Sequence, residues 1–398
     1  MSEPELVLLP SISARRTDSG GFILTQKYLE GVAEYARTWP GKITSLTRSG
    51  QSSAGNFDDV EAPPDSPEGA LEERPTDLSA LMERLSGASA VLGFLSRGDA
   101  PLAPLCKAQG IPLIYVSEYA PETERAIMRA EVRSPLLRLR RQIWLNRTEA
   151  MRKKAVAQAA GLQCSGMPTY ELYTPLQPNS MVFFDNRVRS DGVVAEADCA
   201  AKAETLAAGG PLRLVFGGRF SPMKGVMDLP DVADELRRLG VAFRFDIYGD
   251  GPQKEALAAR ITALQLDDVM RICPPVDFRT EWVKVLREEQ ELFVCPHPQG
   301  DPASTYPEVM SCGVPMVGYA NSAFRGIVKR SGCGWLTPVG QPKALAAEIA
   351  RLDKARQEIS QMALDGLGFA RENTFEATFR RRMEHVMGVA RGLAASAT

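Results

Sequence analysis

Residues 212–240, LRLVFGGRFSPMKGVMDLPDVADELRRLG, decide the fold. The apolar run at the start predicts a buried strand, and a glycine-rich turn leads from it into a helical pattern that ends at Gly240. A strand that passes through a turn into a helix is the repeating unit of parallel α/β sheets. Ligands bind such sheets at the carboxyl ends of the strands, so the turn at 217–225 is a candidate site.

The same alternation extends in both directions along the chain. Towards the C-terminus, short apolar runs and helical patterns alternate up to residue 352, which predicts six α/β units in one doubly wound sheet. Towards the N-terminus, residues 6–9, 88–96 and 111–119 predict further buried strands, and residues 22–39 predict a helix. Residues 51–76 are polar, Pro-rich and acidic, and predict a mobile loop.

This pattern predicts two α/β domains. A helical segment that ends in Gly209–Gly210 places the boundary near residue 205, so we expect an N-terminal domain over 1–204 and a C-terminal domain over 205–372. The last segment, 373–398, repeats apolar residues at close to i, i+4 spacing. It predicts a long helix that packs back on the N-terminal domain.

The composition excludes several classes of protein. The chain has 398 residues, 44% of them hydrophobic and 24% charged, and a net charge of -2, so it is globular and shows no general basicity that would indicate nucleic acid. Seven cysteines without a C-x-x-C pair predict reduced thiols rather than disulfides or a zinc site. Only two histidines argue against a Ser-His-Asp hydrolase. No signal peptide or apolar span of about 20 residues is evident, so we expect a cytoplasmic protein.

The turn GGRFSPMKG at 217–225 carries two cations. Arg219 and Lys224 stand five residues apart, so both are candidates to hold one anion, and Gly218 lets the backbone approach it closely. The turn is not a Walker A loop. The plainer interpretation is an ordinary strand-to-helix loop with two solvated cations.

A second candidate site, CPHPQGDPASTYPEVMSCGVP at 295–315, also follows a predicted strand and enters a helix. Ser304 and Thr305 supply hydroxyls and amides at the helix start, which attracts anions. Glu308 lies on the first turn, where a carboxylate can accept hydrogen bonds from two neighbouring sugar hydroxyls. The plainer interpretations are simple capping for the hydroxyls and a favourable helix dipole for the glutamate.

Further candidates stand where other predicted strands end or helices begin. Glycines let the backbone approach a ligand at such places, and a carboxylate there can orient a hydroxyl. The plainer interpretations are turn shaping and helix capping. These candidates are Tyr248 and Gly249 in one turn, Val276 with its backbone near a base edge, Gly20 and Gly21 at the opening of the first helix, and Glu118 after a strand.

The segment Arg125–Lys154 is locally basic. It holds ten Arg or Lys residues against two Glu residues, a net charge of +8, with leucines, Ile143 and Trp144 interleaved. A basic helix with apolar residues can dock on anionic lipid. A polyanionic acceptor and a merely solvated helical face remain open as alternatives.

Taken together, VFGGRFSPMKG, YGDGP and VCPHPQGDPASTYPEVMSCGVPMVGY resemble the donor-domain signature of the GT-B retaining glycosyltransferases of family four, the glycosyl transferases group 1. The resemblance covers residues 212–340 and rests on order, spacing and strand context. It implies two Rossmann-like domains that face each other across a cleft, with the sugar nucleotide in the C-terminal domain and the acceptor in the N-terminal one. It also implies the following roles: Arg219 and Lys224 hold the diphosphate, Glu308 binds the ribose, Val276 meets the base through its backbone, and Ser304 and Thr305 lie near the phosphates or the sugar.

The chain departs from the family pattern at two positions. A glutamate often stands eight residues before the ribose glutamate, where this chain has Gly300, and we expect Asp301 to replace it with a shift of one residue. A histidine often follows the N-terminal strand at the place of Ser117 or Glu118. No histidine role is therefore assigned, and Glu118 is kept as the candidate.

The resemblance and the cations predict a retaining, metal-independent glycosyltransferase without a cofactor. Negative charge builds on the leaving diphosphate, and preorganised cations stabilise it. The expected acceptor is a cell-surface polysaccharide or a lipid-linked glycan, with Arg125–Lys154 as a contact to an anionic membrane surface at the inner face of the membrane. A sugar-nucleotide epimerase and a catalytically silent binding module of a polysaccharide-assembly complex are the alternatives.

Overall fold

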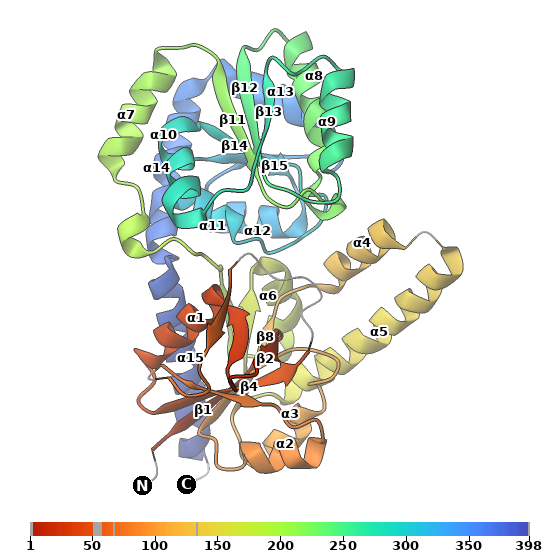
Figure 1. Ribbon diagram of the computed structural model, residues 1–398, viewed down its shortest axis with the longest axis vertical. Coiled ribbons are helices and arrows are strands. Elements are labelled where there is room, and N and C mark those ends of the chain that lie inside the picture. Colours follow the sequence, from red (N-terminus) through yellow and green to blue (C-terminus); the bar gives the residue numbers. More distant parts are fainter. Residues whose placement is uncertain (1–2, 51–57, 67, 133, 397–398) are drawn as a thin grey trace.

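The computed structural model describes residues 3–50, 58–66, 68–132 and 134–396, and it has two lobes, each built around its own sheet (Figure 1). The sheet of the C-terminal lobe is parallel throughout, in the order β13-β12-β11-β14-β15-β16. The predicted six-unit α/β sheet is therefore confirmed. Its strands are β11 (Leu212–Gly217), β12 (Phe243–Tyr248), β13 (Met270–Cys273), β14 (Leu292–Cys295), β15 (Met316–Tyr319) and β16 (Trp335–Thr337).

Helices cover both faces of this sheet, because its strands are apolar on both sides. One face packs against α8 (Leu229–Arg238), α9 (Lys254–Ala263) and α13 (Pro342–Asp353). The other packs against α10 (Val283–Glu289), α11 (Thr305–Ser311), α12 (Ser322–Ser331) and α14 (Arg356–Glu372).

The sheet of the N-terminal lobe has a parallel body in the order β10-β9-β8-β7-β1-β4, with β6 on β4. One face packs against α2 (Leu78–Leu85), α3 (Leu102–Ala108), α5 (Pro135–Gln158) and α6 (Met167–Tyr173), and α4 (Pro121–Glu131) packs on α5. The body strands are β1 (Glu5–Leu9), β4 (Lys42–Ser49), β6 (Ala70–Glu73), β7 (Ala90–Phe94), β8 (Leu113–Ser117), β9 (Gly161–Ser165) and β10 (Ser180–Phe183).

A short antiparallel extension beyond β4 corrects two expectations. Its strands are β2 (Ser13–Arg16), β3 (Phe22–Thr25) and β5 (Asp59–Ala62). The helix expected over 22–39 begins only at α1 (Gln26–Ala36), because Phe22 and Leu24 alternate into a small core against β5. The loop expected over 51–76 contains β5 and β6, while residues 51–57 and 67 lie outside the described part.

The chain returns to the N-terminal lobe through α15 (Phe375–Ser396), which runs from the second lobe down to the first (Figure 1). Phe375, Phe379 and Met383 enter the core beneath β1 and β7, beside α1. Residues 397–398 of the expected 373–398 segment lie outside the described part.

The first crossing between the lobes lies in residues 184–195, after β10. The next helix, α7 (Glu196–Ala207), packs against α14, and the Lys202 ammonium donates to the carbonyl of Leu286 at 2.9 Å. This packing places α7 with the second sheet. The crossing therefore comes earlier than the boundary expected at residue 205.

Candidate active site

Two glycines shape the turn that carries Arg219 and Lys224. Gly225, at φ +64°, lies so close to the segment after β14 that a Cβ atom would sit 2.0 Å from the carbonyl oxygen of Pro296. Gly249, at φ +144°, similarly lies against the carbonyl oxygen of Gly218. The close approach at Gly225 brings the turn after β11 against the turn after β14, at one carboxyl edge.

The two turns meet in an ion pair between Lys224 and Asp301. The Nζ atom of Lys224 lies 2.5 Å from Oδ2 of Asp301, and both side chains are largely buried. Arg219, by contrast, has an exposed side chain that forms no ion pair with any residue the structure describes. The charge of Lys224 is therefore already partly compensated by Asp301, whereas the charge of Arg219 is open to an anion.

Glu308 is buried on α11 and is bound by an arginine that the sequence analysis did not single out. Nε of Arg187 lies 2.7 Å from Oε1 of Glu308, and its Nη2 donates to Oε2 at 3.3 Å. The guanidinium also lies 3.8 Å from the ring centroid of Phe278. Arg187 belongs to the segment between the lobes, and no local pattern connects it with a glutamate 121 positions away.

Ser304 and Thr305 stand at the start of α11, half-buried. The Ser304 hydroxyl makes no capping hydrogen bond, and its carbonyl accepts from the amide of Glu308 at 3.1 Å. The interpretation of Ser304 as a side-chain cap is therefore wrong. Its hydroxyl is not committed to the helix.

Tyr248 is the last residue of β12, Gly249 follows it directly, and Val276 follows β13. Tyr248 is buried edge-on against Trp282, with ring centroids 5.3 Å apart. Val276 is half-buried between β13 and the π-helical turn Phe278–Trp282. Both residues thus shape one wall at the carboxyl edge of the second sheet.

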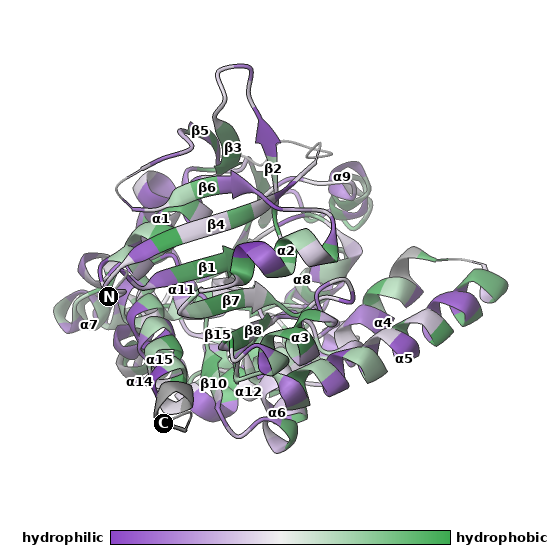
Figure 2. Cartoon of the chain, turned by 90° about the horizontal axis from the view of Figure 1, so that it is seen from below, coloured by the Kyte–Doolittle hydropathy of each residue, from purple (hydrophilic) through white to green (hydrophobic). Residues whose placement is uncertain are grey.

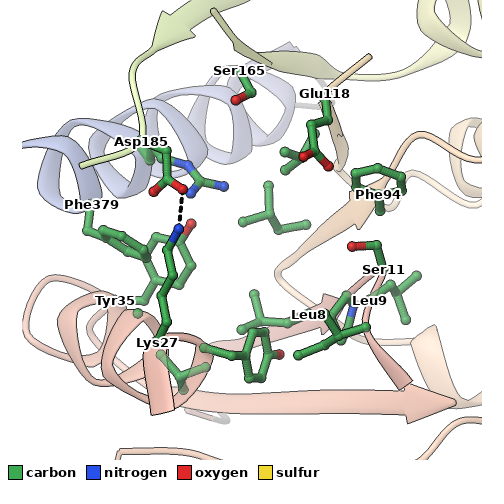
Figure 3. A pocket seen from close by; sticks show the side chains of 18 of the residues that line it. Leu8, Leu9, Ser11, Lys27, Tyr35, Phe94, Glu118, Ser165, Asp185 and Phe379 are labelled. Atoms are coloured by element: carbon green, nitrogen blue, oxygen red, sulfur yellow. Dashed lines mark hydrogen bonds and ion pairs between the residues drawn. The ribbon is translucent and has the colours of Figure 1, made fainter. Parts of the chain in front are cut away.

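The facing edge of the first sheet holds a cavity of about 310 Å³ (Figure 3). Leu8, Leu9, Tyr35, Phe94 and Phe379 form apolar walls, whereas Glu118, Ser165 and an ion pair between Lys27 and Asp185 supply polar groups. Pro302 of the other lobe closes one side. The cavity therefore opens beside the turn that carries Asp301.

Glu118, in the first lobe, interacts electrostatically with Asp301 of the second lobe. Burial raises the pKa of its carboxyl group, and the carboxylates of Asp301 and Asp185 raise it further. Nearby, the hydroxyl of Thr123 donates across the lobes to the carbonyl of Gly300 at 2.8 Å. The structure thus brings Glu118, Asp301 and Lys224, which are far apart in sequence, into one region.

Gly20 and Gly21 do not open a helix. They lie in the turn between β2 and β3, where the Gly20 amide donates to the carbonyl of Thr17 at 3.0 Å and the Thr17 amide donates to the carbonyl of Gly21 at 2.9 Å. Neither glycine lines the cavity. The expected placement at the opening of the first helix is therefore wrong, because that helix begins after an intervening strand.

The chain also contains cysteines and other possible metal ligands. All seven cysteines are buried and free. In the part of the chain that the structure describes, no group of three or more His, Cys, Asp or Glu side chains is arranged to hold a metal ion. His297 is buried beside Tyr306, and burial, followed by the charge of Lys224, lowers its pKa well below the ordinary value.

Comparison with known sequences matches residues 200–363 to the family model described as glycosyl transferases group 1. The putative colanic acid biosynthesis glycosyltransferase WcaL of Salmonella typhimurium is 24% identical over 247 residues, which cover 60% of this chain and 52% of the relative. The amylovoran biosynthesis glycosyltransferase AmsK of Erwinia amylovora is 26% identical over 162 residues, 39% of each chain. The chain thus spans about half, or less, of the length of these curated relatives.

Two solved structures match nearly the whole chain. Anabaena Alr3699/HepE in complex with UDP aligns with a TM-score of 0.64 at 13% identity, over 97% of this chain and 99% of the other. WaaG, a glycosyltransferase involved in lipopolysaccharide biosynthesis, aligns with a TM-score of 0.60 at 13% identity, over 96% and 100%. Residues 200–363 therefore match the model of the glycosyl transferases group 1 family, and the chain has the expected GT-B fold of two Rossmann-like domains.

Proposed function

We propose that this chain is a retaining, metal-independent glycosyltransferase that moves a sugar from a nucleoside-diphosphate sugar to a glycan or lipid-linked acceptor. The observation that carries the proposal is the convergence of Lys224, Asp301 and the Arg187–Glu308 pair at one sheet edge, opposite the cavity beside Glu118. The family match supports a role in polysaccharide assembly, and so do the names of the relatives, which refer to colanic acid biosynthesis and amylovoran biosynthesis.

In the proposed reaction, the bond between the anomeric carbon and the diphosphate oxygen breaks. A new bond forms from that carbon to the acceptor oxygen, and the proton of the acceptor hydroxyl passes to the departing diphosphate, which keeps the electron pair of the broken bond. Lys224 and the exposed Arg219 would stabilise the charge that accumulates on the diphosphate, a task that a metal ion performs in other enzymes. Glu308 would accept hydrogen bonds from the ribose, and Glu118 would orient the acceptor hydroxyl.

The acceptor would occupy the cavity of the first lobe. Aromatic and aliphatic walls with a few polar groups at the rim are typical of small-molecule sites. Tyr35, Phe94 and Phe379 supply apolar surface, and the Lys27–Asp185 pair supplies charge at the rim. Such a lining suits an acceptor with both apolar and polar parts, so a lipid-linked glycan fits better than a purely polar sugar.

The paired helices α4 and α5 supply the proposed contact with an anionic membrane. They lie side by side and project from the first lobe, with apolar and polar residues alternating along α5 (Figure 2). Leu136 is 80% exposed and Trp144 49% exposed, and a groove along α5 ends at Arg97, whose guanidinium lies 5.5 Å from the Trp144 ring centroid. Arg133 of the basic segment lies outside the described residues. The other exposed cationic and large apolar members of the segment are Arg129, Leu137, Arg138, Leu139, Arg140, Arg141, Ile143, Arg147, Lys153 and Lys154.

This surface supports a location at the cytoplasmic face of a membrane. Exposed apolar side chains beside cations are the arrangement that binds anionic lipid. None of the helices within the described residues is both long and apolar enough to cross a bilayer. Co-sedimentation with phosphatidylglycerol vesicles, compared with phosphatidylcholine vesicles, tests the membrane contact.

The function itself is tested with a panel of nucleoside-diphosphate sugars, starting with UDP-sugars because solved neighbours were crystallised with UDP. Release of the nucleoside diphosphate and of the sugar is followed with and without EDTA, and the anomeric configuration of the product is read by NMR. We expect slow release that persists in EDTA and retention of configuration. Conversion of the donor to an epimer would instead indicate an epimerase, and tight binding without turnover would indicate a silent module.

A further inference from the structure

Arg187 places its guanidinium on the carboxylate proposed to bind the donor ribose. Its Nε atom contacts Oε1 of Glu308 and its Nη2 atom contacts Oε2, so each oxygen accepts one hydrogen bond from the arginine. A carboxylate has about four acceptor positions, two on each oxygen. One position on each oxygen therefore remains for a second donor.

The burial of Glu308 makes this partner necessary. The residue is only 2% exposed, and an ionised carboxylate at such a place is costly unless it is paired. Removal of Arg187 would leave this buried charge without its partner, which is strongly unfavourable. Arg187 thus compensates the buried charge of Glu308 and orients its two oxygens.

The backbone on both sides of Arg187 is fixed. The side-chain Nδ2 of Asn186 donates to Ser311 Oγ at 3.1 Å and to the carbonyl of Asn373 at 2.9 Å, and the backbone amide of Phe375 donates to the carbonyl of Val188 at 2.9 Å. The guanidinium is also stacked over Phe278. A side chain held at its base and along its plane supplies a preorganised support for its partner.

We propose that Arg187 is the positioning residue that holds Glu308 in the state that accepts the two neighbouring hydroxyls of the donor ribose. This inference rests on the proposed function, because it assumes a nucleoside diphosphate at this edge. It assigns to the segment between the lobes a part in recognising the ribose. Arg187 itself need not touch the donor.

The test compares the affinities of ribonucleotides and deoxyribonucleotides by calorimetry. UDP, ADP, GDP and CDP are titrated into the wild-type protein with their 2′-deoxy counterparts. We expect the best-bound nucleotide to be preferred over its 2′-deoxy form by roughly 10- to 100-fold, as for a hydrogen bond to a charged group. In Arg187→Met this preference falls close to one, and in Arg187→Lys it is intermediate because a single point charge remains.

Arg213→Met is the matched control. Nη2 of Arg213 lies 3.0 Å from Oε1 of Glu291, another buried glutamate, but at the opposite end of β11. This variant loses a comparable ion pair, so we expect a lower melting temperature and an unchanged ribose preference. If Arg187 had a purely structural role, Arg187→Met would behave like Arg213→Met, with a lower melting temperature and an unchanged ribose preference.

Each outcome decides one of the two proposals. An unchanged ribose preference in Arg187→Met and Arg187→Lys, or tighter binding in either variant, overturns the positioning role and leaves the proposed function standing. Equal binding of the ribose and deoxyribose forms by the wild type also overturns the positioning role and leaves the proposed function standing. If no nucleotide of the panel binds the wild type, the proposed function fails and this inference fails with it.

Discussion

The ammonium group of Lys224 lies 2.5 Å from the carboxylate of Asp301, although the two residues come from different turns of the second lobe. Their pairing joins the turn after β11 to the turn after β14. It satisfies a largely buried charge on each side and leaves the exposed Arg219 as the unpaired cation in the described part of this edge. A departing diphosphate would meet one paired and one unpaired cation.

Lys224→Ala is expected to keep the fold and to lower turnover at saturating donor by about 10²- to 10³-fold. The physical reason is the loss of a preorganised donor to the leaving group, a loss of roughly 2.7–4 kcal/mol of transition-state stabilisation. Release of nucleoside diphosphate measures the rate, and circular dichroism measures the fold. Lys284→Ala is the control, since Lys284 pairs with Glu288 at 4.0 Å on the solvent-exposed side of α10. An unchanged rate in Lys224→Ala would refute the assignment.

Gly225→Ala is expected to cost more stability than Gly240→Ala. Both glycines have positive φ values, +64° and +74°, so alanine pays about 1–2 kcal/mol at either position. At Gly225 the added Cβ would also meet the carbonyl oxygen of Pro296 at 2.0 Å, whereas at Gly240 nothing lies within 4 Å. Thermal melting compares the two, with a shift of about 2–4 °C per kcal/mol.

The same pair of variants tests whether the close approach at Gly225 places Lys224. Movement of the turn would separate Lys224 from Asp301, so Gly225→Ala should also lower kcat/KM, whereas Gly240→Ala should not. Equal melting temperatures and equal rates would mean that the turn relaxes without cost, and that its tight packing does not position the cation.

Glu118→Gln is expected to raise the melting temperature at neutral pH. Burial, then Asp301 and Asp185, raise the pKa of Glu118 in the folded state above the ordinary 4.5, so the folded protein binds this proton more tightly than the unfolded one. Stability from this group is present below the ordinary carboxyl pKa and is lost as pH rises through the folded pKa. The gain from Glu118→Gln should therefore shrink as pH falls towards 4.5.

Melting curves of wild type and variant between pH 4.5 and pH 8 check this expectation. Glu122→Gln removes the same charge at an exposed side chain in the first turn of α4 and serves as the control. If the ionised carboxylate orients the acceptor, turnover should also fall with decreasing pH in the wild type. A stability gain that grows at low pH would contradict the raised pKa.

The second sheet was predictable because each of its units is local in sequence. The strand at Leu212–Gly217 and the helix at Leu229–Arg238 carry their own apolar pattern, and strand ends in parallel sheets meet at one edge. The candidates Lys224 and Glu308 came from that rule, whereas Asp301 came from the resemblance to the family pattern. Their common edge follows from topology, without knowledge of side-chain contacts.

What the sequence did not reveal depends on long-range pairing. Phe22–Thr25 fits a helix and a strand equally well over four residues, and only its pairing with Asp59–Ala62 decides for the strand. Arg187 and Lys27 bind carboxylates that are 121 and 158 positions away in sequence. No spacing rule connects such residues.

Replacing Leu136, Ile143 and Trp144 together by Ser is expected to weaken binding to phosphatidylglycerol vesicles by at least about tenfold. These side chains are 80%, 46% and 49% exposed, and burying each in a bilayer interface is favourable by up to about 1.5–3 kcal/mol. The neighbouring arginines add roughly 1 kcal/mol each near an anionic surface, so binding should also weaken as salt is raised. Vesicle co-sedimentation at two salt concentrations measures both contributions.

The matched control replaces Leu239, Leu336 and Val339 by Ser. These residues are 47%, 40% and 44% exposed, but they lie on the other lobe, away from the cationic segment. A general loss of surface hydrophobicity would weaken vesicle binding in both triple variants, whereas a specific docking surface on α5 predicts a loss only in the first. Equal binding of the wild type to phosphatidylcholine and phosphatidylglycerol vesicles would exclude α5 as the membrane contact. Unchanged vesicle binding by the triple variant of Leu136, Ile143 and Trp144 would exclude it as well. The surface of α5 would then remain a candidate for contact with a polyanionic acceptor.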